Sequence, residues 1–166
     1  TEEEKRYLAR YMEEIKTIKA EEAGERQKLF AASIEGDALA RGRLIELYLE
    51  KVVEVAKEMY HKEVFLGDLI QEGNVSLMLA LDELKSAEEA HGKIMEEVRA
   101  GMQMLIEEQT EVKRRDHTLL EKYTDLDDNI KKLKEETGRD VTIEEVSAFL
   151  DMPEEEINDI LNLGEQ

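Results

Sequence analysis

Residues 68–84 read DLIQEGNVSLMLALDEL, the pattern of a helix with two distinct faces. At 3.6 residues per turn, an apolar stripe collects on one side. That stripe comprises Leu69, Ile70, Gly73, Leu77, Ala80, Leu81 and Leu84. The opposite side mixes polar and apolar side chains, namely Asp68, Gln71, Glu72, Asn74, Val75, Met78 and Leu79. The stretch predicts a helix with one face in a core. Asp68 and Gln71 have capping-box spacing, which predicts the helix start at Asp68.

The mixed face has two explanations. A purely solvated face would carry Lys and Glu without hydrophobic neighbours, so Met78 among amides and carboxylates suits a partner helix that presents arginines beside apolar side chains. Alternatively, a neighbouring helix of this chain covers Met78. Helical geometry leaves both explanations open.

Further helices are predicted on both sides of this stretch from the spacing of apolar residues. Helices are expected over residues 2–23, 25–35 and 38–61, with a break at Gly24 and a capping aspartate at Asp37. Residues 85–92 lack an apolar period and predict a loop, and an amphipathic helix follows from Ile94 to Val112. The charge switch at residues 113–116 is the predicted linker.

Beyond this linker, the sequence predicts a helix over residues 117–137, a short helix and a final helix. Gly138 ends the first helix, and Thr142 and Glu145 form a capping box for the short one, which runs to Leu150. Pro153 falls near the first position of the last helix, where its missing N–H does no harm. The expected core against Ile130 and Leu133 comprises Val141, Ile143, Val146, Phe149, Leu150, Met152, Ile157, Ile160 and Leu161.

Composition excludes several classes of function. The 166 residues contain no cysteine and carry a net charge of −19, which argues against strong non-specific binding to nucleic acids. His61, His91 and His117 are far apart and lack metal-ligand spacing. We therefore expect no enzyme activity, no cofactor and no small-molecule substrate. The absence of a long apolar run and of a leader predicts a cytoplasmic protein that does not enter membranes.

The charge is unevenly distributed along the chain. Residues 82–112 carry 3 basic and 9 acidic side chains, and residues 121–166 carry 5 and 15. Between them, residues 113–120 carry 3 basic and 1 acidic side chain, with Lys113, Arg114 and Arg115 as the basic island.

Residues 68–81 resemble the core-polymerase-binding motif of the bacterial sigma-70 family of transcription initiation factors. In that family, the helix docks on an arginine-bearing coiled coil of the largest subunit of RNA polymerase. The resemblance carries the contact positions to Asp68, Gln71, Glu72, Asn74 and Met78. Ser76 departs from the usual glycine.

The resemblance extends to the flanking segments. Glu35-Gly-Asp37, residues 40–46 and residues 52–57 are similar to the family's preceding helices, although Tyr48 and Glu50 stand where asparagine and arginine are usual. Residues 133–139, 142–146 and 152–157 are similar to the family's third region.

The promoter-melting segment departs most from the family pattern. Residues 85–97 contain no aromatic side chain on which flipped bases could stack, and Glu96 and Glu97 stand where the family has a tryptophan pair. Ala100 and Met104 replace polar or basic residues of the promoter-reading helix. Positions that could still contact DNA are Arg99, Gln103, Lys113, Arg114, Arg115 and His117. For the basic island, a solubilising linker is the alternative reading.

The sequence thus predicts an all-α protein: a sigma-70 region-2-like helical domain over residues 1–112 and a region-3-like, helix-turn-helix-like three-helix domain over residues 113–166. The expected function is transcription initiation as a sigma factor bound to core RNA polymerase, with promoter DNA contacted only weakly or within that complex. The alternative is a degenerate paralogue that binds the polymerase as a regulator or split-sigma subunit without melting promoters. A helical adaptor unrelated to transcription would leave the matched contact residues unexplained.

Overall fold

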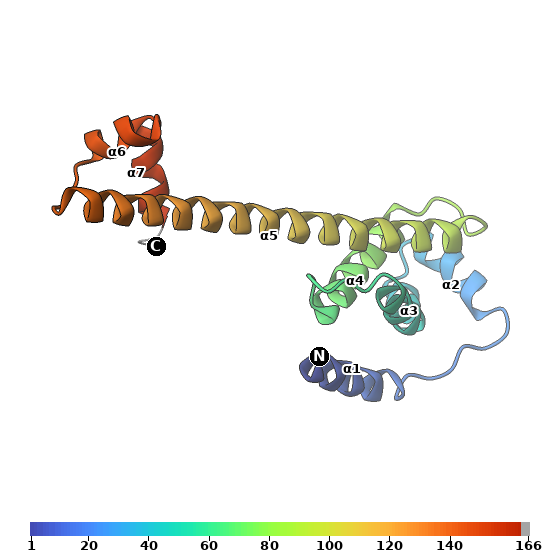
Figure 1. Ribbon diagram of the computed structural model, residues 1–166. Coiled ribbons are helices and arrows are strands. Elements are labelled where there is room, and N and C mark those ends of the chain that lie inside the picture. Colours follow the sequence, from blue (N-terminus) through green and yellow to red (C-terminus); the bar gives the residue numbers. More distant parts are fainter. Residues whose placement is uncertain (164–166) are drawn as a thin grey trace. The chain divides into compact units, whose positions relative to one another are not determined.

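The computed structural model describes residues 1–163, which form seven helices and no strand. The helices are α1 (Glu2–Ile15), α2 (Glu25–Ile34), α3 (Ala38–Glu58), α4 (Leu66–Glu83), α5 (Ala90–Thr137), α6 (Ile143–Leu150) and α7 (Glu154–Leu163). Figure 1 shows their order along the chain. The prediction of an all-α fold is confirmed.

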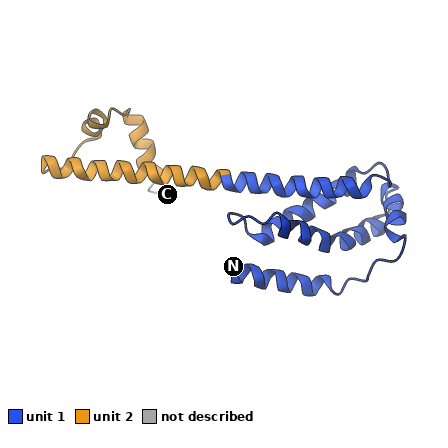
Figure 2. Cartoon of the chain, turned by 45° about the vertical axis from the view of Figure 1, so that its right-hand side comes forward, with its two compact units in different colours: residues 1–110 blue, residues 111–166 orange. Residues whose placement is uncertain are grey.

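The chain divides into two compact units, residues 1–110 and residues 111–166 (Figure 2). Unit 1 contains α1 to α4 and the first part of α5, whereas unit 2 contains the rest of α5 with α6 and α7. Each unit has its own hydrophobic core.

In unit 1, α3 packs against α2 and α4, and α1 lies against α3 and α4 on the side away from α5 (Figure 1). The core holds large side chains without solvent exposure, among them Phe30, Leu44, Tyr48, Leu69 and Met102. The turn before α3 has the glycine and the capping aspartate that the sequence predicts. Gly36 has a φ of 100°, which favours glycine, and the Asp37 carboxylate accepts hydrogen bonds from the backbone N–H groups of Leu39 and Ala40.

In unit 2, Gly138 ends α5 with a φ of 68°, and the Thr142 hydroxyl accepts the Glu145 backbone N–H at 3.2 Å to start α6. Pro153 directly precedes α7. The predicted capping residue and helix order are therefore confirmed. The core is small, with four buried side chains among the described residues: Leu126, Val146, Ile157 and Ile160.

Several predicted boundaries were wrong. The first helix ends at Ile15 rather than near residue 23, because residues 16–18 form a turn and the chain is irregular up to Gly24. The loop after α4 is shorter than predicted, since α5 begins at Ala90. Residues 113–116 do not interrupt the helix, and α5 is continuous from Ala90 to Thr137. Lysine, arginine and aspartate are all compatible with a helix, so the change of charge does not end it.

Two details of capping and core were also wrong. The residue that caps α4 is Phe65 rather than Asp68, and Phe65 contributes no side-chain hydrogen bond. Ile143 and Phe149 lie outside the core of unit 2, with 38% and 48% of their surfaces exposed. Helix α6 has eight residues and turns only a narrow apolar stripe toward this small core. Val146 and Leu150 form that stripe.

Candidate functional site

Helix α4 buries the apolar stripe that its sequence predicts. Leu69, Ile70 and Leu77 have no exposed surface, and Gly73 is also buried. A Cβ atom on Gly73 would overlap Val52 and Met102, so the glycine permits α3 and α5 to approach α4 closely. This packing fixes the rotation of α4 and therefore which side chains it turns outward.

The outward face of α4 carries the five residues of the predicted binding motif. Asp68 and Gln71 are exposed, whereas Glu72, Asn74 and Met78 are half-buried. Two large hydrophobic neighbours are also uncovered, with 46% of Val75 and 57% of Leu79 exposed. Carboxylates, amides and apolar side chains therefore share one face. We call these seven residues the outer face of α4.

Helix α1 contacts one edge of this outer face. The Gln71 amide Nε2 donates to the Tyr7 hydroxyl at 3.1 Å, and the Asn74 amide Nδ2 donates to the Tyr11 hydroxyl at 2.9 Å. Burial raises the pKa of Tyr11, so its hydroxyl stays protonated at neutral pH. The neighbouring helix thus reaches the amides, while Val75 and Leu79 remain uncovered.

Glu4 is a residue beside the candidate site whose contacts sequence reasoning missed. Its buried carboxylate accepts the backbone N–H of Leu66, the first residue of α4, at 2.8 Å and the Tyr60 hydroxyl at 3.0 Å. Burial alone would raise the pKa of Glu4, but the hydrogen bonds from Leu66, Tyr60 and Thr1 outweigh it and lower the pKa below its usual value. The sequence sets Glu4 on the helix face of Tyr7 and Tyr11 and at capping-box spacing from Thr1, but neither pattern indicates that its carboxylate caps another helix.

Ser76 and Gly101 form a complementary pair between α4 and α5. Ser76 is buried, and a Cβ atom on Gly101 would overlap its hydroxyl group. The serine that departs from the family pattern is thus accommodated by the absence of a side chain on the facing helix.

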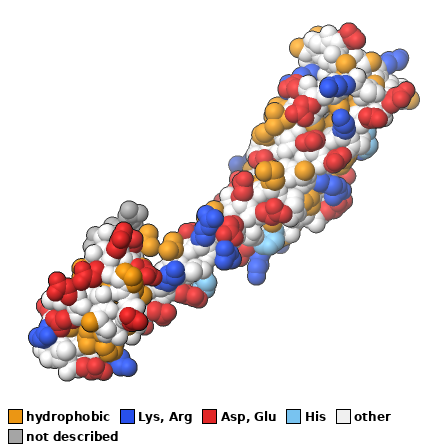
Figure 3. All heavy atoms as spheres, turned by 90° about the horizontal axis from the view of Figure 1, so that it is seen from above, with side chains coloured by type: hydrophobic (Ala, Val, Ile, Leu, Met, Phe, Trp, Pro, Cys, Tyr) orange, Lys and Arg blue, Asp and Glu red, His pale blue; other side chains and the backbone are white. Residues whose placement is uncertain are grey.

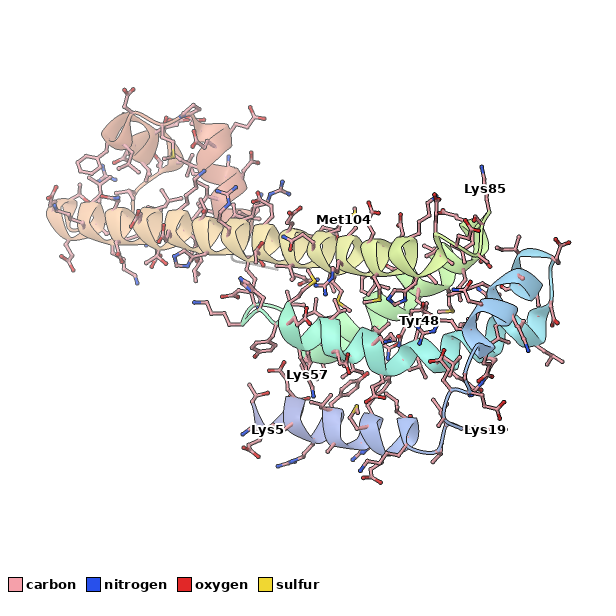
Figure 4. The ribbon with its side chains drawn as sticks, turned by 90° about the vertical axis from the view of Figure 1, so that its right-hand side faces the viewer. Lys5, Lys19, Tyr48, Lys57, Lys85 and Met104 are labelled. Carbon is pink, nitrogen blue, oxygen red and sulfur yellow. The ribbon has the colours of Figure 1, made fainter. Side chains whose placement is uncertain are left out.

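Tyr48, another departure from the family pattern, lies fully buried and makes polar contacts at its hydroxyl. This hydroxyl is 2.6 Å from His91 Nδ1, and the Arg26 guanidinium stacks over the ring at 5.0 Å from its centre. Burial raises the pKa of Tyr48 to about 12, and burial also lowers the pKa of His91. Figure 4 shows Tyr48 on α3, in the interior of unit 1. These contacts stabilise the fold and lie apart from the outer face of α4.

The predicted DNA-contacting residues of unit 1 are exposed but engaged with acidic neighbours. The Arg99 guanidinium pairs with Glu58 at 2.9 Å, and the Gln103 amide donates to Glu107 at 3.2 Å. Met104, on the next position, is 61% exposed and points away from α3 (Figure 4). This part of α5 offers DNA little net positive charge.

In unit 2, the residues of the basic island are all exposed on α5. Arg114 and Arg115 both bond to Glu111, at 2.7 Å and 3.2 Å, and His117 contacts Glu121 at 2.9 Å. Lys113 is exposed beside them. Because Glu111 neutralises part of the arginine charge, the island is a weaker site for phosphates than its sequence indicates.

Figure 3 shows acidic side chains spread over the surface of each unit, with no extended basic area in view. Among residues 1–163, no group of three histidine or acidic side chains is arranged to hold a metal ion. In the same part of the chain, no helix is long and apolar enough to span a membrane. The outer face of α4 combines exposed hydrophobic side chains with carboxylate and amide groups at the positions of the predicted binding motif, and it is the candidate site.

Comparisons with known proteins relate both units to one family. The family model of sigma-70 region 3 matches residues 121–166. RNA polymerase sigma factor SigA of Listeria monocytogenes is 28% identical over 158 residues, and SigA of Listeria innocua gives the same values. Each alignment covers 94% of this chain but 42% of the relative, so the chain spans about two fifths of the length of these curated relatives.

A solved structure of a flagellar sigma/anti-sigma complex, Sigma-28/FlgM, also matches. Its TM-score is 0.41 at 26% identity, and the match covers 74% of this chain and 53% of that chain. The region 3 match and the sigma-factor relatives show that this chain is similar to sigma factors of the sigma-70 family.

Proposed function

We propose that this chain acts in transcription initiation as a sigma-type factor, and that it binds core RNA polymerase through the outer face of α4. The observation that carries this proposal is the exposure of Val75 and Leu79 beside Asp68 on an otherwise well-packed helix. Full burial of an exposed apolar side chain contributes about 1.5–3 kcal/mol. Val75 and Leu79 are already partly covered, so a partner that completes their burial gains a fraction of this amount from each.

The chemistry of this face points to the kind of partner. Asp68 and Glu72 carry negative charge, and Gln71 and Asn74 supply amide groups, which suit arginine guanidinium groups. The half-buried Met78 adapts its shape to apolar neighbours. The sigma-70 resemblance assigns these positions to a coiled coil of the largest polymerase subunit, and we propose the same partner here.

Charge reversal at Asp68 tests this interface. We expect Asp68→Arg to repel the partner's arginines and to reduce co-purification with core polymerase by at least about tenfold, because truncation of a buried interfacial charge typically costs 2–5 kcal/mol. Glu54→Arg, which makes the same charge change on an exposed position of α3, is the matched control. Circular dichroism would check that both variants remain helical. Equal recovery of the two variants would exclude the proposed interface.

A second candidate function is a polymerase-binding regulator or split-sigma subunit that does not melt promoters by itself. Residues 85–97 offer no aromatic surface to a flipped base, and Glu96 and Glu97 are exposed where phosphates would approach. We expect a fluorescence-anisotropy titration with single-stranded −10 DNA to stay flat into the range of tens of micromolar at physiological salt. A sub-micromolar, sequence-dependent isotherm would instead favour promoter melting.

A further inference from the structure

Three side chains of α1 attach this helix to α4. Glu4, Tyr7 and Tyr11 follow at spacings of three and four residues and therefore share one face of α1. Glu4 binds the backbone N–H of Leu66 at 2.8 Å, while the two tyrosine hydroxyls bind the Gln71 and Asn74 amides. We call Glu4, Tyr7 and Tyr11 the clasp. The clasp thus joins one helix to two polar groups of the outer face and to the start of α4.

Aromatic packing holds the clasp in a defined place. The rings of Tyr7 and Tyr11 stack with their centres 6.1 Å apart, and Phe65 meets Tyr7 edge-on at 5.7 Å. Gly67 makes this approach possible, because a Cβ atom there would lie 2.7 Å from the Phe65 ring and 3.0 Å from the Tyr7 ring. The Tyr7 ring is therefore packed against the first turn of α4, and the Tyr11 ring stacks on the Tyr7 ring.

The amide of Asn74 is restrained through this contact. Its Oδ1 atom is buried and has no hydrogen-bond partner among the described residues, and its Nδ2 atom donates the 2.9 Å bond to Tyr11 that restrains the amide. A solvated amide would sample several rotamers and lose that freedom when a partner binds. An amide that is already oriented loses less rotamer freedom when a partner binds.

We propose that Tyr11, supported by Tyr7, is a positioning residue that orients the Asn74 and Gln71 amides for the partner of α4. This inference rests on the proposed function, because it assigns Tyr11 a role at the same surface. Tyr11 acts through Asn74 and contributes to binding without requiring a contact with the partner of its own. The opposite role, in which α1 masks the amides and must leave before the partner binds, is an outcome of the same test.

The test is a double-mutant cycle on the full chain. Affinity for core polymerase would be measured for wild type, Tyr11→Phe, Asn74→Ala and the double variant. Tyr11→Phe should weaken binding roughly 2- to 10-fold, the range for one net hydrogen bond. Because Tyr11 acts through Asn74, the double variant should bind no more weakly than Asn74→Ala alone. Tyr123→Phe removes a hydroxyl from a half-buried tyrosine of unit 2 and should bind like wild type.

The coupling between the two substitutions in polymerase binding is the readout that a purely structural role would leave unchanged. The bond itself is checked in the free protein by the Asn74 side-chain amide resonance in a nitrogen-15 correlation spectrum. This resonance should shift in Tyr11→Phe while the thermal midpoint stays within a few degrees of wild type. Tighter binding of Tyr11→Phe would show masking and overturn the proposal, and so would independent, additive effects of the two substitutions.

Asp68→Arg, measured in parallel, separates the two proposals. If Asp68→Arg loses binding and Tyr11→Phe binds like wild type, the proposed binding surface on α4 is supported and the positioning role of Tyr11 is wrong. If Asp68→Arg binds like wild type, the proposed surface itself is wrong, and the positioning role fails with it.

Discussion

The two units differ in how much of their stability comes from a core. Unit 1 buries large side chains from α2, α3, α4 and α5, including Phe30, Tyr48, Leu69 and Met102. Unit 2 buries four apolar side chains among its described residues, and its helices are further defined by local polar contacts. Arg139 forms a two-point ion pair with Glu145 at 3.0 Å and 2.8 Å beside the Thr142 cap.

The turn between α6 and α7 illustrates this local control. Asp151 adopts a left-handed conformation with a φ of 53°, and the Met152 backbone N–H donates to the Ser147 carbonyl at 3.2 Å. The Ser147 hydroxyl donates to the Met152 carbonyl at 2.5 Å. Unit 1 therefore rests on a large core, whereas unit 2 depends more on caps and turns that specify its fold.

The largest expected effect is the loss of the core of unit 2. Ile157 has no exposed surface, and Ile157→Ala should cost about 2–5 kcal/mol, a large fraction of the stability of so small a unit. Hydrogen exchange resolved by residue should show rapid exchange throughout α6 and α7 and unchanged protection in α3 and α4. Ile143→Ala, at an exposed position of the same unit, should change little. Equal protection in both variants would refute the small-core account.

Removal of the α6 cap should have a smaller effect on the same unit. Thr142→Ala deletes the hydroxyl that accepts the Glu145 N–H and should destabilise unit 2 by about 1 kcal/mol. Thr142→Ser keeps the hydroxyl and serves as the control. Thermal unfolding followed by NMR signals of α6 would measure the difference, and identical midpoints for the two variants would contradict a capping role.

In unit 1, Gly101→Ala tests the close contact of α4 and α5. Overpacking against Ser76 should cost about 1–3 kcal/mol, partly offset by about 1 kcal/mol gained when alanine replaces glycine in a helix. Gly92→Ala, where a Cβ atom meets nothing within 4 Å, should not destabilise the protein. Adding Ser76→Gly to Gly101→Ala should restore the lost stability in chemical denaturation. A lack of restoration would show that the two positions are not coupled.

The smallest expected effect is a pH dependence of α1 docking. Because the folded-state pKa of Glu4 lies below its ordinary value of 4.5, its contribution to stability is present above the unfolded pKa and is lost as pH falls through the folded pKa. Acidification to pH values below the ordinary pKa of 4.5 should therefore shift the Leu66 amide resonance as the cap is lost. Glu4→Gln should abolish this particular titration, and its persistence in that variant would assign it to another group.

Sequence patterns predicted well the features that depend on neighbours along the chain. The buried stripe of α4, the Asp37 and Thr142 caps and the glycines that end helices all follow from periodicity or local hydrogen bonding. The continuous α5 was missed because a charge switch was read as a helix boundary, although arginine, lysine and aspartate all continue a helix.

The candidate site was predicted less completely. The residues of the outer face followed from helical geometry and the sigma-70 resemblance, but the Glu4 cap and the two tyrosine contacts join positions more than sixty residues apart. Single-sequence periodicity describes one element at a time and cannot identify such pairs. Likewise, Glu58 pairs with Arg99 across 41 residues, which periodicity cannot identify. The pairs of Glu111 with Arg114 and Arg115 are local, at spacings of three and four residues, and helical spacing could have indicated them.

The most direct test of the central claim is site-specific photocrosslinking from the outer face of α4. A photoreactive phenylalanine analogue would replace Val75, which is 46% exposed, and a second protein would carry it at Glu54 on α3 as the control. After mixture with core polymerase and irradiation, the Val75 position should give a covalent product with the largest subunit, and the Glu54 position should give far less. No product from Val75, or equal yields from both positions, would contradict the proposal that this face binds the polymerase.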